Sequence, residues 1–213
     1  VIVTGGARGL GRVIAGTFLD AGADVVVCAR NAPDSPVTSS DGARSAMFVA
    51  ADVREPDQVS AVVAATVEAN GRLDVLVNNA GRSIRRSLAL SFDRFHDFER
   101  TMQLNYFGSV RLIMGFAPGM LERRRGHVVN ISSIGVLTNA PRFSAYVASK
   151  SALDAFSRCA AAEWSDRNVT FTTINMPLVK TPMIAPTKIY DSVPTLTPDE
   201  AATMVADAIV YRP

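Results

Sequence analysis

Short apolar runs without a polar residue alternate with segments of helical periodicity along this chain. The runs at residues 25–27 and 75–77 (VVV and VLV) are typical of strands that are covered on both faces. An alternation of such strands with helices predicts one doubly wound α/β domain with a parallel sheet over residues 1–213. Six strands are predicted, at residues 1–3, 24–28, 45–51, 73–77, 127–132 and 169–175.

Helices are predicted between these strands from apolar residues at helical spacing. They cover residues 12–21, 55–70, 92–121, 144–164 and a last segment that opens at Pro198. The run RRRG at residues 123–126 is expected to end the long third helix, with Gly126 as its cap. Val1 already lies inside a predicted strand and Pro213 follows directly on a helix, so we expect the domain to be truncated at both ends.

Composition argues against several classes of protein. The net charge of +2 is too small to indicate a nucleic-acid partner. The two histidines, His96 and His127, leave little material for a metal site or a Ser-His-Asp triad, and no metal is expected. Cys28 and Cys159 lie in a predicted strand and helix, which is typical of reduced thiols. No apolar run reaches ~18 residues, so no transmembrane segment is expected.

A glycine-rich turn, Gly5-x-x-x-Gly9-x-Gly11, follows the first predicted strand and opens the first helix. Glycines at this place let the backbone approach a pyrophosphate, which binds at the helix N-terminus. A tight turn selected for packing is the alternative. The position at the first strand–helix junction favours nucleotide binding in a Rossmann-like sheet. Gly5, Gly9, Leu10 and Gly11 are therefore candidate cofactor-binding residues.

The second strand ends in Cys28-Ala29-Arg30, without the acidic residue that binds the ribose 2′-OH in NAD enzymes. Arg30, together with Arg8 of the glycine turn, can instead pair with a 2′-phosphate, which indicates NADP(H) as the cofactor. Two solvated arginines are the alternative. Asp52 ends the third strand and is a candidate for the adenine edge, with Val53 beside it.

The fourth strand is followed by Asn78-Asn79-Ala80-Gly81. Small residues in such a turn admit a ligand, so Asn79, Ala80 and Gly81 are candidate cofactor contacts. The asparagines could equally be turn formers that hold neighbouring strands together. The sequence does not decide between these two roles.

Tyr146 and Lys150 are spaced i and i+4, so on a helix they share one face. A cation there stabilises the tyrosinate and is expected to lower the pKa of the phenol from its ordinary ~10. A phenol tuned in this way can act as a general acid. Ser133 lies just after the fifth strand and can donate to a developing oxyanion. Taken alone, the pair could also be a surface tyrosine and an ordinary helix lysine.

Taken together, these motifs resemble the short-chain dehydrogenases/reductases over nearly the whole chain. The matching residues are Thr4, Gly5, Gly9, Gly11, Asp52, Asn78–Gly81, Asn105, Ser133, Tyr146 and Lys150. The resemblance implies that Ser133 orients a substrate carbonyl and that Tyr146 donates the proton. It implies that Lys150 lowers the tyrosine pKa and binds the nicotinamide ribose, and that Asn105 holds a water in a proton relay.

The same resemblance implies further contacts at the nicotinamide end of the cofactor, from Pro177, Val179 and Thr181. Leu178 departs from the glycine that the family usually has after this proline. A seventh strand is expected beyond residue 213. Family members commonly pair the helices predicted at 92–121 and 144–164, so a homodimer or homotetramer is expected.

From residue 82 onward the resemblance narrows to bacterial long-chain fatty acyl-CoA reductases, whereas residues 1–81 resemble the family in general. The matching segments are 82–87, 93–102, 105–108, 142–146 and 176–190. Leu178 is itself usual in this group. The implied reaction is the reduction of an acyl-CoA thioester to a fatty aldehyde with NADPH, in the cytoplasm or at the membrane periphery if the substrate is long-chain.

Two other functions are compatible with the sequence. A ketone reductase or alcohol dehydrogenase of the same family would use identical chemical residues. A non-catalytic NADP-binding sensor or scaffold would not need all four of Asn105, Ser133, Tyr146 and Lys150, which argues against it.

The roles of two surface features remain open. The cluster of Arg82, Arg85 and Arg86 either meets CoA phosphates or is a solvated loop, and residues 183–198 form either a substrate lid or a rigid connection.

Overall fold

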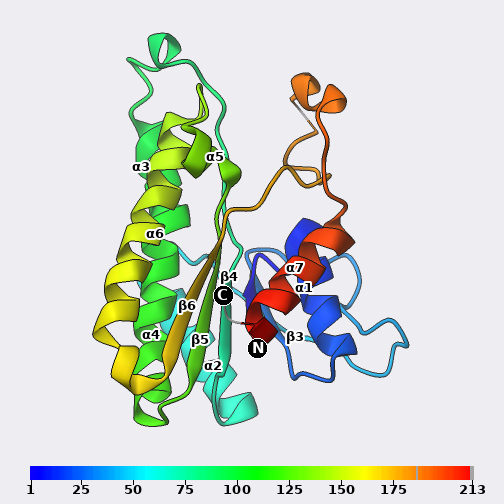
Figure 1. Ribbon diagram of the computed structural model, residues 1–213. Helices are drawn as coiled ribbons and strands as arrows, with labels where there is room; N and C mark the ends of the chain where they lie inside the picture. Colours follow the sequence, from blue (N-terminus) through cyan, green and yellow to red (C-terminus); the bar gives the residue numbers. More distant parts are fainter. Residues whose placement is uncertain (186, 212–213) are drawn as a thin grey trace.

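Six parallel strands form one sheet in the order β3-β2-β1-β4-β5-β6 (Figure 1). The computed structural model describes residues 1–185 and 187–211. The strands are β1 (Ile2–Thr4), β2 (Val26–Ala29), β3 (Met47–Ala50), β4 (Val75–Asn78), β5 (Gly126–Ile131) and β6 (Val169–Ile174). Because the chain runs outward from β1 in one direction and then returns to β4 on its other side, the strand order reverses between β1 and β4. Ligands of such sheets bind outside the carboxyl ends of the strands at this point.

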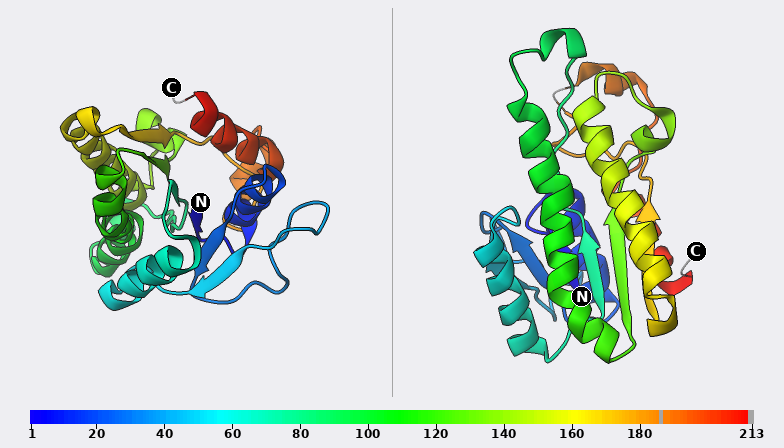
Figure 2. Two further views of the ribbon diagram at one scale, coloured as in Figure 1. Left: turned by 90° about the horizontal axis from the view of Figure 1, so that it is seen from below. Right: turned by 90° about the vertical axis from the view of Figure 1, so that its left-hand side faces the viewer.

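Helices cover both faces of the sheet, α1 and α7 on one face and α2, α4 and α6 on the other (Figures 1 and 2). Their bounds are α1 (Gly9–Asp20), α2 (Pro56–Asn70), α3 (His96–Met102), α4 (Gly108–Glu122), α5 (Ile134–Thr138), α6 (Ser144–Glu163) and α7 (Pro198–Tyr211). Three short 3₁₀ turns are η1 (Leu88–Leu90), η3 (Ser165–Arg167) and η4 (Lys188–Ser192), and the π-helical segment η2 (Gln103–Phe107) joins α3 to α4.

Neighbouring residues of each strand point into two separate apolar layers, because side chains alternate between the faces of a sheet. Ile2 and Leu76 pack toward α2, α4 and α6, whereas Val3 and Val77 pack toward α1 and α7. All four are fully buried. The uninterrupted apolar runs in the sequence follow from this double cover.

The predicted fold class and all six strands are confirmed. The cap predicted for the long helix is wrong. The helix ends at Glu122, and Arg124 takes the left-handed conformation (φ 52°) there. Gly126 instead begins β5, where an added Cβ would lie 2.6 Å from the sulfur of Met120. Its small size is therefore needed for packing.

The long helix also begins later than predicted, at His96, and the chain before it makes the separate turn η1. The short helix α5, which directly follows Ser133, has no counterpart among the predicted elements. The seventh strand expected beyond residue 213 lies outside the described residues. Among the described helices, none combines the length and the hydropathy needed to cross a membrane.

Candidate active site

The carboxyl ends of β1 and β4 are joined by hydrogen bonds to a single threonine. The hydroxyl oxygen of Thr4 accepts hydrogen bonds from the backbone N–H groups of Asn79 (3.0 Å) and Ala80 (2.9 Å). The side-chain amide of Asn79 donates to the carbonyl oxygen of Thr4 at 2.8 Å. These bonds fix the loop after β4 against the end of β1, at the point where the strand order reverses.

The turn that follows β1 requires glycine for two reasons, the backbone angle at Gly5 and Gly9 and close packing at Gly11. Gly5 and Gly9 have positive φ angles of 67° and 56°. A Cβ on Gly11 would lie 2.4 Å from both the Asn79 amide nitrogen and the Gly5 carbonyl oxygen. Arg8 precedes α1 in an extended conformation and makes no side-chain cap, so the first N–H groups of this helix remain available to an anion. The turn therefore fits a dinucleotide pyrophosphate.

The two asparagines after β4 have different partners. Asn78 is buried, and its side-chain amide donates to the Asn130 carbonyl oxygen at 2.9 Å; Asn130 in turn donates to Ser157 at 2.7 Å. Asn78 thus ties β4 to β5 and, through Ser157, to α6. Asn79 instead bonds to Thr4 at the end of β1. Both asparagines therefore hold neighbouring strands together, and a contact of Asn79 with a cofactor stays a prediction.

Arg8 and Arg30 are both exposed, and the structure shows no ion pair for either among the described residues. Arg30 follows β2 next to the end of β3, where Asp52 lies. A bidentate hydrogen bond from Arg54 holds the pKa of Asp52 below its ordinary value, and the charge of Arg30 adds to this effect. Val53 is buried against the backbone face of Gly108.

Ser133 and Tyr146 lie on two consecutive helices. Ser133 caps α5, with its hydroxyl oxygen accepting the N–H of Gly135 at 3.1 Å. Tyr146 is in the first turn of α6, and its phenol is hydrogen-bonded to the Ser133 side chain. The twelve residues between them therefore fold back so that the Ser133 side chain reaches the Tyr146 phenol.

Lys150 follows one turn later and is 4% exposed. Its ammonium group donates to the carbonyl oxygen of Ile131, at the end of β5, at 2.6 Å. Burial lowers the pKa of Lys150 to about 8. Gly81 lies against this lysine, since a Cβ added there would be 3.5 Å from its nitrogen.

The expectation that the pKa of Tyr146 falls is wrong for this structure. Burial raises the pKa of the phenol, the Ser133 hydrogen bond opposes this in part, and the neighbouring Tyr190 raises it further. Lys150 does not lower it, because the pKa of Lys150 is about 8 and its ammonium charge is lost before the phenol titrates. Tyr146 thus keeps its proton at neutral pH, as a proton donor must.

Asn105 lies inside the π-helical segment η2 and is fully buried. Its side chain accepts the N–H of Arg82 (2.8 Å) and donates both to the Arg82 carbonyl (2.9 Å) and to the Ser149 hydroxyl (2.9 Å). Ser149 in turn donates to the carbonyl oxygen of Tyr146 at 2.7 Å. The side chain of Asn105 thus braces the loop after Gly81 against α6, and π-helical turns often occur at functional sites.

Ser149 and Thr4 were not among the candidate site residues. Thr4 was noted only as part of a motif, and Ser149 immediately precedes Lys150 in the sequence. Both are buried polar residues, and apart from the bond of Ser149 to Tyr146 within α6, their bonds depend on which strands and helices become neighbours. The sequence contains no signal for these contacts beyond their closeness to the motifs.

The segment after β6 passes close to Ser133. Met176 accepts the N–H of Ile134, and buried Val179 forms a bridge to Leu196 that closes residues 180–195 into a loop. Pro177 is exposed and Thr181 partly buried at the start of this loop. The loop includes η4, whose Tyr190 interacts electrostatically with Tyr146 and with Arg85.

The three arginines after Gly81 do not share one environment. Arg86 pairs with buried Asp97 (Nε–Oδ2 3.2 Å), whereas Arg82 and Arg85 are exposed. Arg82 and Arg85 are therefore freer than Arg86 to meet an anionic group of a substrate. Whether the three arginines bind CoA phosphates or form a solvated loop stays open.

A comparison with protein families decides the assignment of the chain. The family model described as short chain dehydrogenase matches residues 1–189. The chain belongs to the short-chain dehydrogenase family. Proteins of this family are oxidoreductases that bind a nicotinamide dinucleotide, and the glycine turn and the loop after β4 described above fit such a cofactor.

Individual relatives agree with this assignment. The chain is 52% identical over 218 residues to a fatty acyl-CoA reductase of Acinetobacter baylyi, covering 100% of this chain and 73% of that protein. It is 46% identical over 219 residues to a fatty acyl-CoA reductase of Mycobacterium tuberculosis, covering 100% of this chain and 74% of the relative. A crystal structure of 3-ketoacyl-(acyl-carrier-protein) reductase from Brucella melitensis, complexed with NADH, is 26% identical with a TM-score of 0.86, over 97% of this chain and 88% of that one.

Proposed function

We propose that this short-chain dehydrogenase reduces a fatty acyl-CoA thioester to a fatty aldehyde with NADPH. The observation that carries the proposal is the hydrogen bond between the Ser133 side chain and the Tyr146 phenol, one helical turn from buried Lys150, whose ammonium group lies at the carboxyl end of β5. The two relatives named as fatty acyl-CoA reductases support the choice of substrate. The chain spans about three quarters of their length, and the activity proposed is that of the whole protein.

The glycine turn and the loop after β4 would hold the dinucleotide, with its pyrophosphate over Gly9 and the first turn of α1. Arg8 and Arg30, both exposed, would pair with a 2′-phosphate and so select NADPH over NADH. Asp52 and Val53 would border the adenine. Pro177, Val179 and Thr181 would border the nicotinamide end. When bound, NADPH supplies the hydride for the carbonyl carbon.

The chain's own residues would act on the carbonyl oxygen. The hydroxyl groups of Ser133 and Tyr146 would donate hydrogen bonds to it, so that it is stabilised as negative charge develops. Tyr146 would then deliver the proton, and Lys150 would hold its ammonium charge nearby. With a thioester, the resulting hemithioacetal loses its C–S bond and its hydroxyl proton, which leaves an aldehyde and free CoA. Asn105 and Ser149 would keep the Tyr146 helix in register with the loop after Gly81.

Arg82 and Arg85 would meet the phosphates of the CoA moiety at the rim of the site. Both are exposed, and the backbone of Arg82 is fixed by Asn105. Replacement of both by glutamine should raise KM for acyl-CoA while leaving KM for a free aldehyde unchanged. Equal changes for both substrates would contradict this role.

The substrate is tested by NADPH oxidation with the full-length protein over acyl-CoAs of graded length, with aldehydes and ketones as controls. The proposal expects turnover with long-chain acyl-CoA and release of free thiol. Turnover of ketones alone would identify a carbonyl reductase instead. Binding of NADPH without turnover of any of these compounds would favour a sensor or scaffold.

The cofactor is tested separately by binding affinities for NADPH and NADH. Arg8→Gln and Arg30→Gln together should weaken NADPH binding by one to two orders of magnitude, since two charge-assisted contacts to a phosphate are lost. NADH binding should change little. Equal affinities for the two cofactors in the natural protein would contradict the choice of NADP(H).

Association through α4 and α6 is part of the same proposal. Phe107 and Met114 are 41% and 56% exposed along the α4 side of the molecule. A homodimer or homotetramer would cover them. Light scattering checks this, and monomeric behaviour would contradict it.

A further inference from the structure

The segment that leads into α3 carries large apolar side chains into solvent. Four residues of this segment, which we call the apolar tip, are strongly exposed: Leu88 (59%), Leu90 (67%), Phe92 (90%) and Phe95 (71%). The turn η1 within it stands beyond the ends of the neighbouring helices (Figures 1 and 2). A concentration of exposed apolar groups in so short a segment usually marks a contact with a partner or a membrane.

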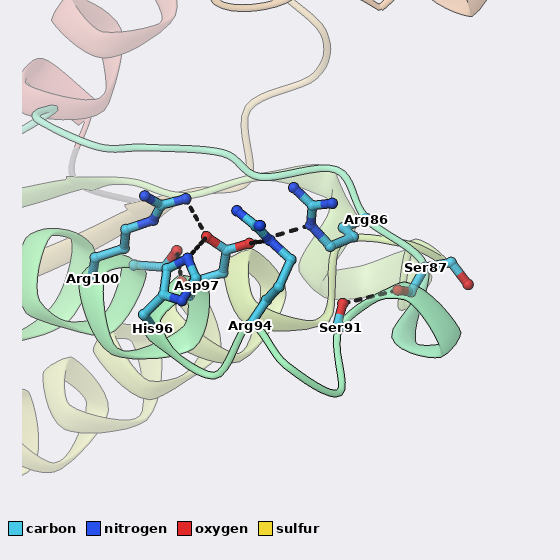
Figure 3. A network of polar contacts seen from close by, with 8 residues as sticks. Arg86, Ser87, Ser91, Arg94, His96, Asp97 and Arg100 are labelled. Atoms are coloured by element: carbon cyan, nitrogen blue, oxygen red, sulfur yellow. Dashed lines mark hydrogen bonds and ion pairs between the residues drawn. The ribbon is translucent and has the colours of Figure 1, made fainter.

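The apolar tip is held outward by polar contacts at its base. Arg86, which precedes the tip, and Arg94, which lies within it between Phe92 and Phe95, both bind the carboxylate of buried Asp97, through Nε–Oδ2 contacts of 3.2 and 3.4 Å (Figure 3). Ser91 adds a hydrogen bond from its hydroxyl to the Ser87 carbonyl at 2.9 Å. The tip is therefore a defined turn whose shape is fixed while its apolar side chains remain in water.

Other exposed apolar residues lie at the same end of the molecule. The short helix α5 exposes Ile134 (41%) and Leu137 (63%), and the loop that contains η4 exposes Met183 (55%). Figures 1 and 2 place η1, α5 and η4 at the same end of the molecule, beyond the carboxyl ends of the strands, with η1 and η4 on opposite sides of it in Figure 1. This is the end at which Ser133 and Tyr146 meet.

The charge of this end is strongly positive. Residues 82–97, which include Asp97 with its partners Arg86 and Arg94, contain four arginines and two aspartates, residues 134–143 one arginine, and residues 176–197 two lysines and one aspartate, a net of +4. The whole chain carries +2, so all other residues together carry −2. Arginines and lysines next to exposed apolar side chains match the surface of a bilayer that contains anionic lipids, where the charges meet headgroups and the apolar groups enter the interface.

We propose that this end of the protein docks on anionic lipid membranes, with Leu88, Leu90, Phe92 and Phe95 inserted at the level of the headgroups. A bilayer surface accommodates a projecting tip, because its interface deforms around side chains. The proposal does not depend on the identity of the substrate. Docking in this orientation would turn the mouth of the site, with Ser133 and Tyr146, toward the lipid.

The test is co-sedimentation of the full-length protein with vesicles of phosphatidylcholine and phosphatidylglycerol in equal amounts, and of phosphatidylcholine alone. The wild type should bind the anionic vesicles, and 1 M NaCl should weaken the binding several-fold. The double variant Leu90→Ser/Phe92→Ser should bind at least tenfold less. The matched control Val67→Ser/Met204→Ser, which removes two exposed apolar residues (43% and 40%) from α2 and α7, should bind as the wild type does.

Two further measurements keep the outcome decisive. The tryptophan introduced by Phe92→Trp should be quenched by brominated lipids, whereas Trp164 of the wild type, which packs against Phe171, should not. Turnover of a short, water-soluble acyl-CoA or aldehyde should be equal in the Leu90/Phe92 variant and the wild type, which separates docking from catalysis. Equal vesicle binding by the two double variants, or no binding by the wild type, would overturn the proposal. A change of the variant's mass in light scattering without any vesicle binding would assign the tip to contact between copies of the chain instead.

Discussion

Asp97 and Lys150 carry opposite charges, are buried to nearly the same degree and lie on the contacting helices α3 and α6. Their surroundings differ sharply. Asp97 is surrounded by three arginines and a histidine (Figure 3), whereas the ammonium group of Lys150 has one backbone carbonyl. The partners of Asp97 also reach solvent, since each arginine side chain is 35–36% exposed.

The pKa values of the two groups reflect this difference. Burial alone would raise the pKa of Asp97, but the Arg94 hydrogen bond and the charges of Arg100, Arg94 and His96 outweigh it and lower the pKa. For Lys150 burial is unopposed by any acidic group, and the pKa falls to about 8. A buried charge that has more partners than it needs stabilises the fold, whereas a buried charge with too few partners can take part in a reaction. Four predictions test this comparison.

The largest effect is expected from removing the phenol hydroxyl of Tyr146, one helical turn from Lys150. Tyr146→Phe should lower kcat by about 10²–10⁴-fold, the range for loss of a positioned general acid. NADPH binding and the free energy of unfolding should change little. Tyr211→Phe, at a tyrosine that is 76% exposed, is the matched control and should retain full turnover. Retained turnover of Tyr146→Phe would show that Tyr146 is not the proton donor. The contrast between a reactive site at Lys150 and a structural one at Asp97 would then be lost.

A second effect concerns the pH dependence of stability. The folded-state pKa of Lys150, about 8, lies below the unfolded value of 10.5, so the unfolded state binds more protons between these limits. The free energy of unfolding should therefore rise with pH across this window, by about 3 kcal/mol from this group alone. Below pH 8 the buried charge costs this amount in full.

Lys150→Met isolates this contribution. The rise should be absent in the variant, as measured by urea denaturation from pH 7 to 10.5. Cys28, whose pKa is raised to about 12 by burial, acts in the opposite direction above pH 9, but it is present in both proteins and cancels in their difference. Parallel pH curves for the two proteins would show that Lys150 is not a costly buried charge.

The motifs of the site could be predicted from the sequence, whereas the contacts that support them could not. Tyr146 and Lys150 are four residues apart on one helix, and the glycine turn follows directly on a strand, so local spacing is enough to find them. The Ile131 carbonyl that binds Lys150 and the Asn105–Ser149 bond depend on how β5, η2 and α6 come together. Periodicity says nothing about such contacts.

The direction of the Tyr146 pKa shift was mispredicted for the same reason. The i, i+4 spacing brings the lysine near the tyrosine. The burial of both groups sets the direction of their pKa shifts, and the Ile131 carbonyl is the group that the ammonium contacts. Asp97 was seen only as one residue of a segment resembling acyl-CoA reductases. Its role follows from the fold, since Arg86 reaches it from a loop eleven positions earlier.

A third, smaller effect is expected for Asp97→Asn. The free energy of unfolding should fall by about 2 kcal/mol, less than for a deeply buried ion pair because the freed arginines can be hydrated. The folded pKa of Asp97 lies below the unfolded value of 3.8, so its contribution is present above about pH 4 and is lost as the pH falls through the folded pKa. The difference between the two proteins should therefore shrink below pH 4. Turnover per folded molecule should be preserved, and a loss comparable to that of Tyr146→Phe would place Asp97 in the site.

The smallest effect is expected for His96→Gln, which removes one of the four basic partners of Asp97. The His96 side chain is 50% exposed, and its nitrogen is 3.4 Å from Oδ1 of Asp97. Because Arg86, Arg94 and Arg100 remain, the free energy of unfolding at pH 6 should fall by no more than about 0.5 kcal/mol, the scale of an exposed ion pair. In the Asp97→Asn background the same substitution should have no further effect. If His96→Gln lowered the free energy of unfolding as much as Asp97→Asn does, the carboxylate would need each of its partners. Asp97 would then have no excess of partners, and its contrast with Lys150 would fail.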